Sequence, residues 1–315
     1  MAILVVGDAN ADLSALVMRF PAEGDYSPVS ALAWGSGGSA ANVATALARL
    51  GTPTRLVARV GRDPAASIAL AAAREAGVDL SAIQVDDTVA TGLCYAAISP
   101  DGERTFFAYR GANRWMQTPD DRALAGIDWI HIAGHALLDH VQAASTEALL
   151  ATTTLPLSLD LCLPLLRERR AAILALLPRL AVVFANQPEF LALHEDVDTG
   201  SHFEALLDRA RHYTLPSAPV MAVKCGARGS IVVDGGGVRH VPAFPVEAID
   251  TNGCGDGFVA GFLTQLRAAA QPVACAQYGN AVGALAATRH GAAESLPLAA
   301  ELALFLETSD VTVYQ

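Results

Sequence analysis

Short apolar runs alternate with helical segments along most of this chain of 315 residues. Runs with the length and composition of buried strands lie at 3–6, 55–60, 128–132, 155–159, 181–185 and 220–223. Helical periodicity follows several of them, at 64–76, 139–150 and 165–177, and helices at 255–269, 272–289 and 297–307 end the chain. Because the connections are short, the pattern predicts an α/β fold with a doubly wound, mostly parallel sheet flanked by helices.

Two β-rich insertions interrupt this alternation. Residues 13–34 contain several breakers and scattered aromatics, and residues 88–110 contain two strand-like stretches around the turn Pro100-Asp101-Gly102-Glu103. The first insertion is too long for a tight connection between a strand and a helix. We expect the two to form a small extra sheet, with ordinary surface hairpins as the alternative, inserted into a single domain spanning 1–315.

The composition is that of an acidic protein, with 52% apolar residues to build a large core. The formal charge of −11, from 32 acidic and 21 basic residues, argues against nucleic acid or an anionic membrane as the main partner. No apolar run reaches the ~18 residues of a membrane helix, and the first run is too short for a secretory signal. Five scattered cysteines without C-x-x-C spacing predict reduced thiols and a cytoplasmic location.

One glycine-rich stretch leads into the helix expected at 255–269. Gly253, Cys254, Gly255 and Asp256 lie at its N-terminus, where unpaired N–H groups and the helix dipole favour an anion. A carboxylate in such a place would repel the anion. Its presence therefore indicates a chemical task, such as accepting a proton from the group that attacks the anion. The stretch therefore indicates phosphoryl transfer to a hydroxyl, although an ordinary capped helix would also contain these residues.

A second glycine-rich helix start lies nearer the N-terminus, where Gly37 and Gly38 precede a helix that contains Asn42. A dinucleotide-binding loop is disfavoured, because the motif does not directly follow the first strand and lacks the G-x-G-x-x-G order. Asn10 and Asp12 come after that first strand. Their spacing of two puts both side chains on one side of an extended segment, although a simple polar loop is the alternative.

Two later segments also follow strands. Asn186 and Glu189 open a helix with the spacing of a capping box. Lys224, Gly226 and Gly229 form a turn between the strand at 220–223 and the next one. A helix cap alone would account for the first of these segments, although capping and ligand binding can coexist there.

Taken together, these motifs resemble those of the ribokinase-like (PfkB) carbohydrate kinases in order and spacing, over essentially the whole chain. The run Asp250-Thr251-Asn252-Gly253-Cys254-Gly255-Asp256 is similar to the family's D-T-x-G-x-G-D, and the segment from Gly37 to Asn42 resembles its G-G-x-x-x-N. Asn10-Ala11-Asp12 resembles the family's N-x-D, and Asn186 with Glu189 its N-x-x-E. The resemblance implies a ribokinase-like fold whose two insertions form a lid over a sugar.

The resemblance also implies a role for each motif in an ATP-dependent transfer to a primary hydroxyl. Asp256 would be the general base, and the amides of residues 253–256 would form the anion hole. The sugar would be bound by Asn10, Asp12, Gly37, Gly38 and Asn42. The nucleotide would be bound by Asn186, Lys224, Gly226, Gly229 and Asn280, with Lys224 in place of a frequent threonine. Glu189 would hold Mg²⁺, usually through water, and Asp250 with the carbonyl of Asn252 would form a K⁺ site.

The substrate stays open between ribose, fructose, 2-keto-3-deoxygluconate and nucleosides. Ser39 stands where some phosphosugar kinases of the family carry lysine, which favours an unphosphorylated substrate. Arg110 would either bind the carboxylate of a sugar acid or be a solvated charge at the lid edge. The exposed edges of the lid favour a homodimer.

Two other classes of function fit the same sheet. A sugar- or nucleoside-binding regulator is disfavoured, because a protein without catalysis has no chemical reason to hold Asp256, Asn186 and Glu189 together. A dinucleotide-dependent oxidoreductase is disfavoured by the lid and by the position of the glycine-rich loops.

Overall fold

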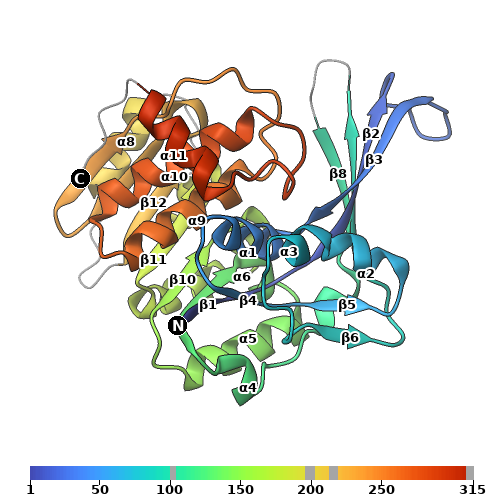
Figure 1. Cartoon of the computed structure of the whole chain (residues 1–315), viewed down its shortest axis with the longest axis horizontal. Helices are drawn as coiled ribbons and strands as arrows, with labels where there is room; N and C mark the ends of the chain where they lie inside the picture. Colours follow the sequence, from blue (N-terminus) through green and yellow to red (C-terminus); the bar gives the residue numbers. More distant parts are fainter. Residues whose placement is uncertain (100–103, 196–202, 213–218, 310–315) are drawn as a thin grey trace.

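The computed structural model describes residues 1–99, 104–195, 203–212 and 219–309, and three β-sheets with their flanking helices make up these residues (Figure 1). The predicted turn at 100–103 lies outside the described residues. Within the described ranges, no helix is both long and apolar enough to cross a membrane.

The largest sheet has eight strands in the order β14-β13-β12-β11-β10-β9-β1-β4. The six strands from β12 to β4 run parallel, and β13 and β14 continue the sheet in antiparallel pairing. This confirms the predicted doubly wound, mostly parallel sheet. The strands are β1 (Ala2–Val6), β4 (Thr54–Val57), β9 (Ile127–Ala133), β10 (Leu157–Asp160), β11 (Val182–Asn186), β12 (Val220–Lys224), β13 (Ser230–Asp234) and β14 (Gly237–Val241).

Helices cover both faces of this sheet, because its central strands are apolar on both sides. In β1, Ile3 and Val5 join one core cluster, whereas Leu4 and Val6 join the other. The first cluster is completed by α1 (Ser39–Arg49), α2 (Pro64–Ala69), α3 (Ala71–Glu75), α9 (Cys254–Arg267), α10 (Pro272–Ala287) and α11 (Ala299–Thr308). The second is completed by α4 (Asp121–Leu124), α5 (His140–Thr152), α6 (Leu163–Leu176), α7 (Gln187–Leu193) and α8 (Phe203–His212).

Two predicted boundaries are wrong in the segment that follows α1. The strand expected at 55–60 is two strands, because β4 ends at Val57 and β5 (Arg59–Gly61) leaves to pair with β6 (Gln84–Asp86) in a two-stranded sheet. The ion pair between Arg59 and Asp86, at 2.9 Å, holds β5 against β6. The helix expected at 64–76 is also divided, into α2 and α3, with Leu70 between them.

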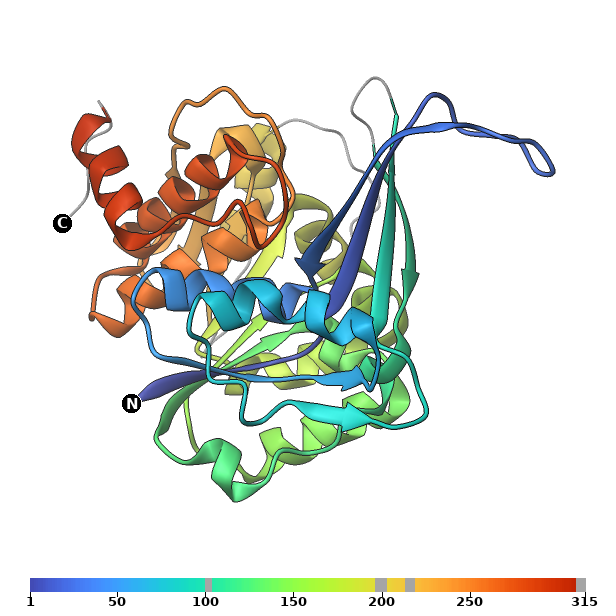
Figure 2. The same ribbon diagram turned by 45° about the vertical axis from the view of Figure 1, so that its right-hand side comes forward.

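The two insertions form a separate four-stranded sheet that projects from the helical body (Figures 1 and 2). Its order is β3-β2-β7-β8, with β2 (Asn10–Val17), β3 (Val29–Gly37), β7 (Gly92–Ile98) and β8 (Arg104–Tyr109). The sheet is larger than the sequence predicted, because β2 already begins at Asn10 and β3 runs on to Gly37. Candidate substrate residues therefore lie on its strands, at the end where the sheet meets the body.

Candidate active site

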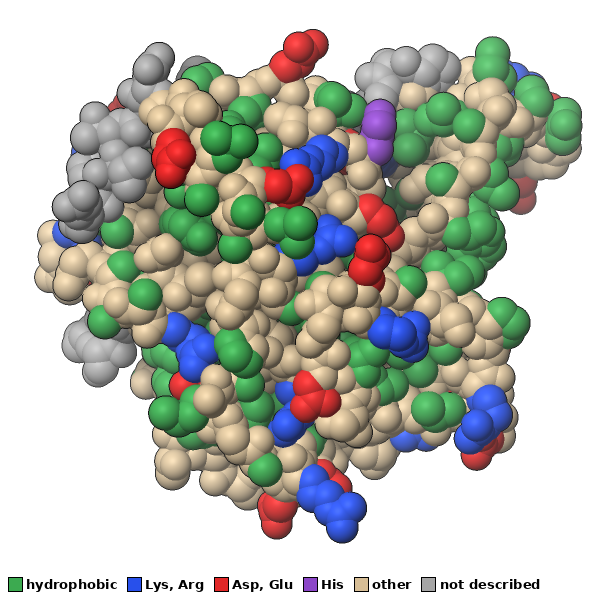
Figure 3. Space-filling view, viewed as in Figure 1, with side chains coloured by type: hydrophobic (Ala, Val, Ile, Leu, Met, Phe, Trp, Pro, Cys, Tyr) green, Lys and Arg blue, Asp and Glu red, His purple; other side chains and the backbone are tan. Residues whose placement is uncertain are grey.

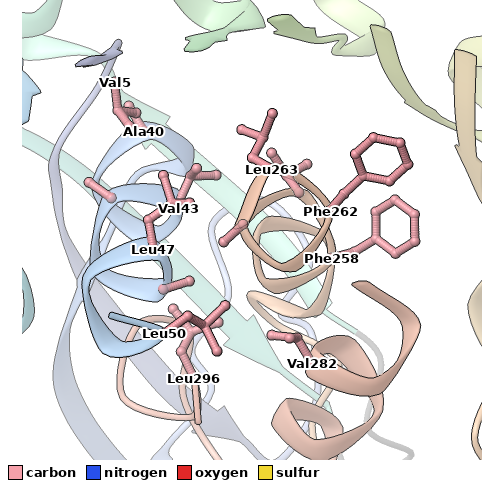
Figure 4. Close-up of a cluster of buried hydrophobic side chains, with 14 of the residues drawn as sticks. Val5, Ala40, Val43, Leu47, Leu50, Phe258, Phe262, Leu263, Val282 and Leu296 are labelled. Carbon is pink, nitrogen blue, oxygen red and sulfur yellow. The ribbon is translucent and has the colours of Figure 1, made fainter. Parts of the chain in front are cut away.

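Helices α1 and α9 pack against each other (Figure 4), and their hydrogen bonds show that the two N-termini meet. At the N-terminal ends, Ser39 and Asn42 of α1 both contact Asp256 of α9; at the C-terminal ends, Thr52 and Thr264 share a hydrogen bond of 3.0 Å. In Figure 4, Val43 and Leu47 lie on the side of α1 that faces α9, and Phe258 and Phe262 point from the other side of α9 toward Phe184 of β11. Packing of two helices distant in sequence thus brings both glycine-rich motifs to one place.

The carboxylate of Asp256 is held at both oxygens. The Ser39 hydroxyl donates to Oδ1 at 2.9 Å, and the Asn42 side-chain amide donates to Oδ2 at 2.8 Å. Burial raises the pKa of Asp256 to about 6, although the hydrogen bond from Asn42 acts to lower it. A carboxylate that is oriented and has a pKa near neutrality suits a general base.

The backbone around Asp256 leaves amides free to bind an anion. Within the described residues, the N–H groups of Gly253, Gly255 and Asp256 have no acceptor, and that of Cys254 makes only a 3.4 Å contact with the Thr251 carbonyl. Gly253 adopts φ +75°, and a Cβ there would lie 2.6 Å from the carbonyl oxygen of residue 292. A glycine is therefore required at 253, and the first turn of α9 matches the predicted anion hole in geometry.

Lys224 adds a positive charge beside this turn. A Cβ on Gly255 would lie 3.6 Å from the Lys224 ammonium nitrogen, which donates to both carboxylate oxygens of Asp160, at 2.7 and 2.9 Å. Burial alone would lower the pKa of Lys224, but the nearby carboxylates of Asp160 and Glu189 raise it above its usual value. The lysine is thus a permanent cation at the edge of the anion hole.

Asn186 and Glu189 form the capping box that their spacing predicts. The Asn186 side chain accepts from the Glu189 N–H at 2.9 Å, and Glu189 accepts from the Asn186 N–H at 2.7 Å. Burial and the Asp160 carboxylate raise the pKa of Glu189 to about 7, while Lys224 acts to lower it. The Glu189 carboxylate therefore lies beside both Asp160 and Lys224 while it caps α7.

The small sheet and the loops that flank α9 line a cavity of about 780 Å³, whose lining includes Asp12 but neither Asn42 nor Asp256. Figure 3 shows the recess between the projecting sheet and the body. Its wall contains Asp12, Ala96, Ile98, Arg104, Asp250 and Glu294, from both parts of the molecule. The sheet therefore lies over the cavity in the manner expected for a lid.

Asp12 is an unsatisfied carboxylate in this wall. Burial raises its pKa to about 7, and Glu294, Asp8 and Asp256 add repulsion. Its Oδ1 and the Oδ1 of Asn42 are buried without a hydrogen-bond partner among the described residues. Buried oxygens of this kind are costly unless a ligand donates to them, and sugar hydroxyls are suitable donors.

Other predicted substrate residues make contacts within the protein. The Asn10 side chain accepts from the Asn113 amide at 2.8 Å. A Cβ on Gly37 would lie 2.1 Å from the Asp12 carboxylate, and one on Gly38 would lie 2.6 Å from the Asp8 carbonyl. Neighbouring protein atoms therefore leave no space for a side chain at either position, independently of any contact with a sugar.

Both interpretations of Arg110 are wrong. Its guanidinium is neither solvated nor free for a sugar acid, because it is paired with Asp139 at 2.8 Å and Asp8 at 3.2 Å. It also donates to the His135 carbonyl and to the side chain of Gln142. Arg110 thus anchors the end of β8 to the start of α5.

The predicted nucleotide residues differ in what they can offer. The Asn280 amide donates to the carbonyls of Val241 and Pro242, at 3.0 and 3.1 Å, so its side chain secures the end of β14. Gly229 has φ +87°, and a Cβ there would lie 2.1 Å from the Val241 carbonyl. Gly226, with φ +58°, has open space where a Cβ would be. A ligand could therefore approach the backbone of Gly226, whereas neighbouring protein atoms cover that of Gly229.

Sequence reasoning missed three charged residues of the site. Asp160, Glu294 and Arg104 all line it or pair with its members. Asp160 could have been found, because it ends a buried parallel strand, where ligand-binding residues gather. Glu294 and Arg104 carry no such signal, since only tertiary packing brings them to the cavity.

Comparison with known proteins agrees with this geometry. Residues 2–299 match the model of the family described as pfkB family carbohydrate kinase. The chain belongs to this family. It is 32% identical over 312 residues to an ATP-dependent ribose-1-phosphate kinase of Halopiger xanaduensis, covering 96% of this chain and 97% of the relative. It is 26% identical to a ribokinase of Staphylococcus aureus, covering 95% and 98%.

A solved structure confirms the fold expected for a family member. The fructokinase of Xylella fastidiosa with bound ATP superimposes with a TM-score of 0.80 at 26% identity, covering 97% of this chain and 98% of that one. The ribokinase-like fold, with its mostly parallel sheet and its small separate sheet, is thus that of a carbohydrate kinase, a phosphotransferase with an alcohol group as acceptor.

Proposed function

We propose that the protein transfers the γ-phosphoryl group of ATP to the primary hydroxyl of a small sugar, with Asp256 as general base. The observation that carries this proposal is the Asp256 carboxylate, oriented by Ser39 and Asn42 beside unpaired amides at the start of α9. Relatives described as ribose-1-phosphate kinase and ribokinase support a pentose or a similar sugar as acceptor.

The acceptor sugar would lie in the cavity under the lid. Its hydroxyls would donate to the unsatisfied oxygens of Asp12 and Asn42, and its primary hydroxyl would face Asp256. Asp256 would remove the hydroxyl proton during attack. The amides of residues 253–256 and the Lys224 ammonium would receive the negative charge of the transferred group, and their fixed positions lower the barrier.

The nucleotide would approach from the side of Asn186, Lys224 and Gly226. Mg²⁺, when bound, would neutralise charge on the phosphates, and the donor set fits such an ion because the Glu189 carboxylate lies close enough to that of Asp160 for their repulsion to raise its pKa. A single carboxylate with waters and substrate phosphates is a common arrangement for Mg²⁺. We propose Glu189 as the contact, through water.

A nucleoside is the second candidate for the acceptor. A cavity of about 780 Å³ lies within the range of pockets that enclose a whole small-molecule ligand, so a base attached to the sugar would also fit. ATP consumption should be measured with ribose, ribose-1-phosphate, fructose, 2-keto-3-deoxygluconate and adenosine. Product analysis of the best substrate identifies the hydroxyl that is phosphorylated. No turnover on any sugar or nucleoside, with the protein folded, would contradict the proposal.

The pKa of Asp256 predicts the pH dependence of the reaction. The carboxylate is raised to about 6 and must be ionised to accept a proton, so kcat/KM should rise with pH through this value and level off above it. In Ser39→Ala one donor to the ionised form is lost, and the midpoint should move to higher pH. Profiles of the wild type, Ser39→Ala and the control Ser81→Ala test this. An unmoved midpoint in Ser39→Ala would count against the assigned base.

We also propose that the lid mediates a homodimer. Its strands β3 and β8 are sheet edges, and Leu32, Trp34, Phe107 and Tyr109 on these strands are each more than half exposed. Exposed apolar side chains beside open edges favour association with a second copy. Sedimentation should show a dimer for the wild type and a shift to monomer for Phe107→Asp, whose side chain is not part of the cavity lining.

A further inference from the structure

An ion pair joins the lid to the loop that begins the anion hole. Arg104, the first residue of β8, contacts the Oδ1 atom of Asp250 through Nη2 at 2.6 Å. The arginine side chain is 21% exposed and the aspartate side chain 8%. Both residues line the cavity proposed for the sugar. The contact is therefore a largely buried charge pair between two parts of the molecule that must come together around a substrate.

The Asp250 carboxylate is fully engaged by donors of the protein. Besides Arg104, Oδ1 accepts the N–H of Asn252 at 2.7 Å, and Oδ2 accepts the N–H of Gly291 at 3.0 Å. The backbone carbonyl of Asp250 accepts from the thiol of Cys254, at 3.8 Å. Each oxygen of this residue thus has at least one donor, and its charge is met by a guanidinium.

This donor set does not fit the K⁺ site implied by the family resemblance. A monovalent cation at Asp250 would lie beside the Arg104 guanidinium, and like charges this close in a buried place repel strongly. The cation would have to displace the guanidinium from the carboxylate to bind there. The chain itself already supplies the positive charge that K⁺ would bring.

The hydrogen bonds of Asp250 also affect the first turn of α9. Asp250 and Asn252 lead directly into Gly253, and Gly253 packs against the carbonyl of Ala292, next to Gly291. The orientation of Asp250 therefore sets the position of the amides that follow it. Since Arg104 belongs to β8 of the lid, the position of the lid and the geometry of these amides are linked through one carboxylate.

We propose that Arg104 is a positioning residue that takes the place of a monovalent cation and couples lid closure to the anion hole. The inference rests on the proposed kinase function of the site. It implies an enzyme that is indifferent to K⁺. It also implies that loss of the guanidinium opens Asp250 to K⁺, which would then restore part of the lost positioning.

Thermal unfolding tests the cation site without any activity. KCl should be titrated against choline chloride at constant ionic strength, with the wild type, Arg104→Gln and the control Arg62→Gln, whose exposed side chain pairs with Asp87. We expect no K⁺-specific change in Tm for the wild type and the control, and a K⁺-specific rise for Arg104→Gln. A K⁺-specific rise in the wild type, or none in Arg104→Gln, would overturn the proposal.

Turnover measurements test the coupling. In choline chloride, Arg104→Gln should lose at least about tenfold in kcat, with a smaller change in KM for ATP, and KCl should restore part of the loss. Arg104→Lys, which keeps a charge, should retain more activity and stay indifferent to K⁺. If Arg104→Gln has the wild-type kcat in both salts, the coupling is wrong even though the protein is a kinase. If no variant phosphorylates any sugar while the Tm results hold, the kinase proposal fails and the cation inference stands.

Discussion

Asp256→Asn is expected to lower kcat by roughly 10²–10⁴-fold, the usual contribution of a positioned general base. The asparagine has almost the shape of the aspartate, so Ser39 and Asn42 can still contact it, and the amides of the first turn of α9 stay in place. The substitution removes the ability to accept a proton while the anion hole remains. We therefore expect KM for the sugar and for ATP to change by only a few fold.

Steady-state kinetics with the best substrate and direct titration with ATP provide the measurement. Asp87→Asn is the matched control, because its side chain is 70% exposed and pairs with the exposed Arg62. It should have wild-type kcat. A rate near that of the wild type in Asp256→Asn would refute the base assignment, and a folded variant that no longer binds ATP would show that the carboxylate acts in binding.

From the sequence, parts of this candidate site could be predicted where neighbouring residues determine both the local structure and the chemistry. Gly253 to Asp256 had to start a helix, and a carboxylate among free amides has few roles other than catalysis. Asn186 and Glu189 were predictable as a cap, because a capping box is set by residues three apart. Features of this kind depend only on residues within one helical turn of each other, and the structure confirms their geometry.

Residues whose partners are distant in sequence were not predictable. Arg110 looked free at a lid edge, but Asp8 and Asp139 come to it from two other elements. Asn280 was assigned to the nucleotide, yet its amide secures carbonyls after β14. A polar side chain in a sequence does not show which buried acceptor it will meet, because that depends on how the sheet and helices pack.

Lys224→Met should have the second large effect, on both stability and turnover. The lysine pairs with Asp160, and the two side chains are 16% and 8% exposed. Removing one partner leaves a buried carboxylate without its counter-charge, which typically costs about 3–5 kcal/mol in the free energy of unfolding. The ammonium beside Gly255 is lost as well, so kcat should fall by at least about tenfold even where the variant is folded.

The double variant Asp160→Asn/Lys224→Met separates these two effects. With both charges gone, the desolvation cost disappears, and the free energy of unfolding should return to within about 1–2 kcal/mol of the wild type. Turnover should stay low, because the cation at the anion hole is still missing. Urea unfolding and kcat of both variants provide the measurement, with Arg62→Met as an exposed control that should change neither. Recovery of kcat in the double variant would mean that Lys224 serves only to neutralise Asp160, and that the amides of α9 bind the phosphoryl group without it.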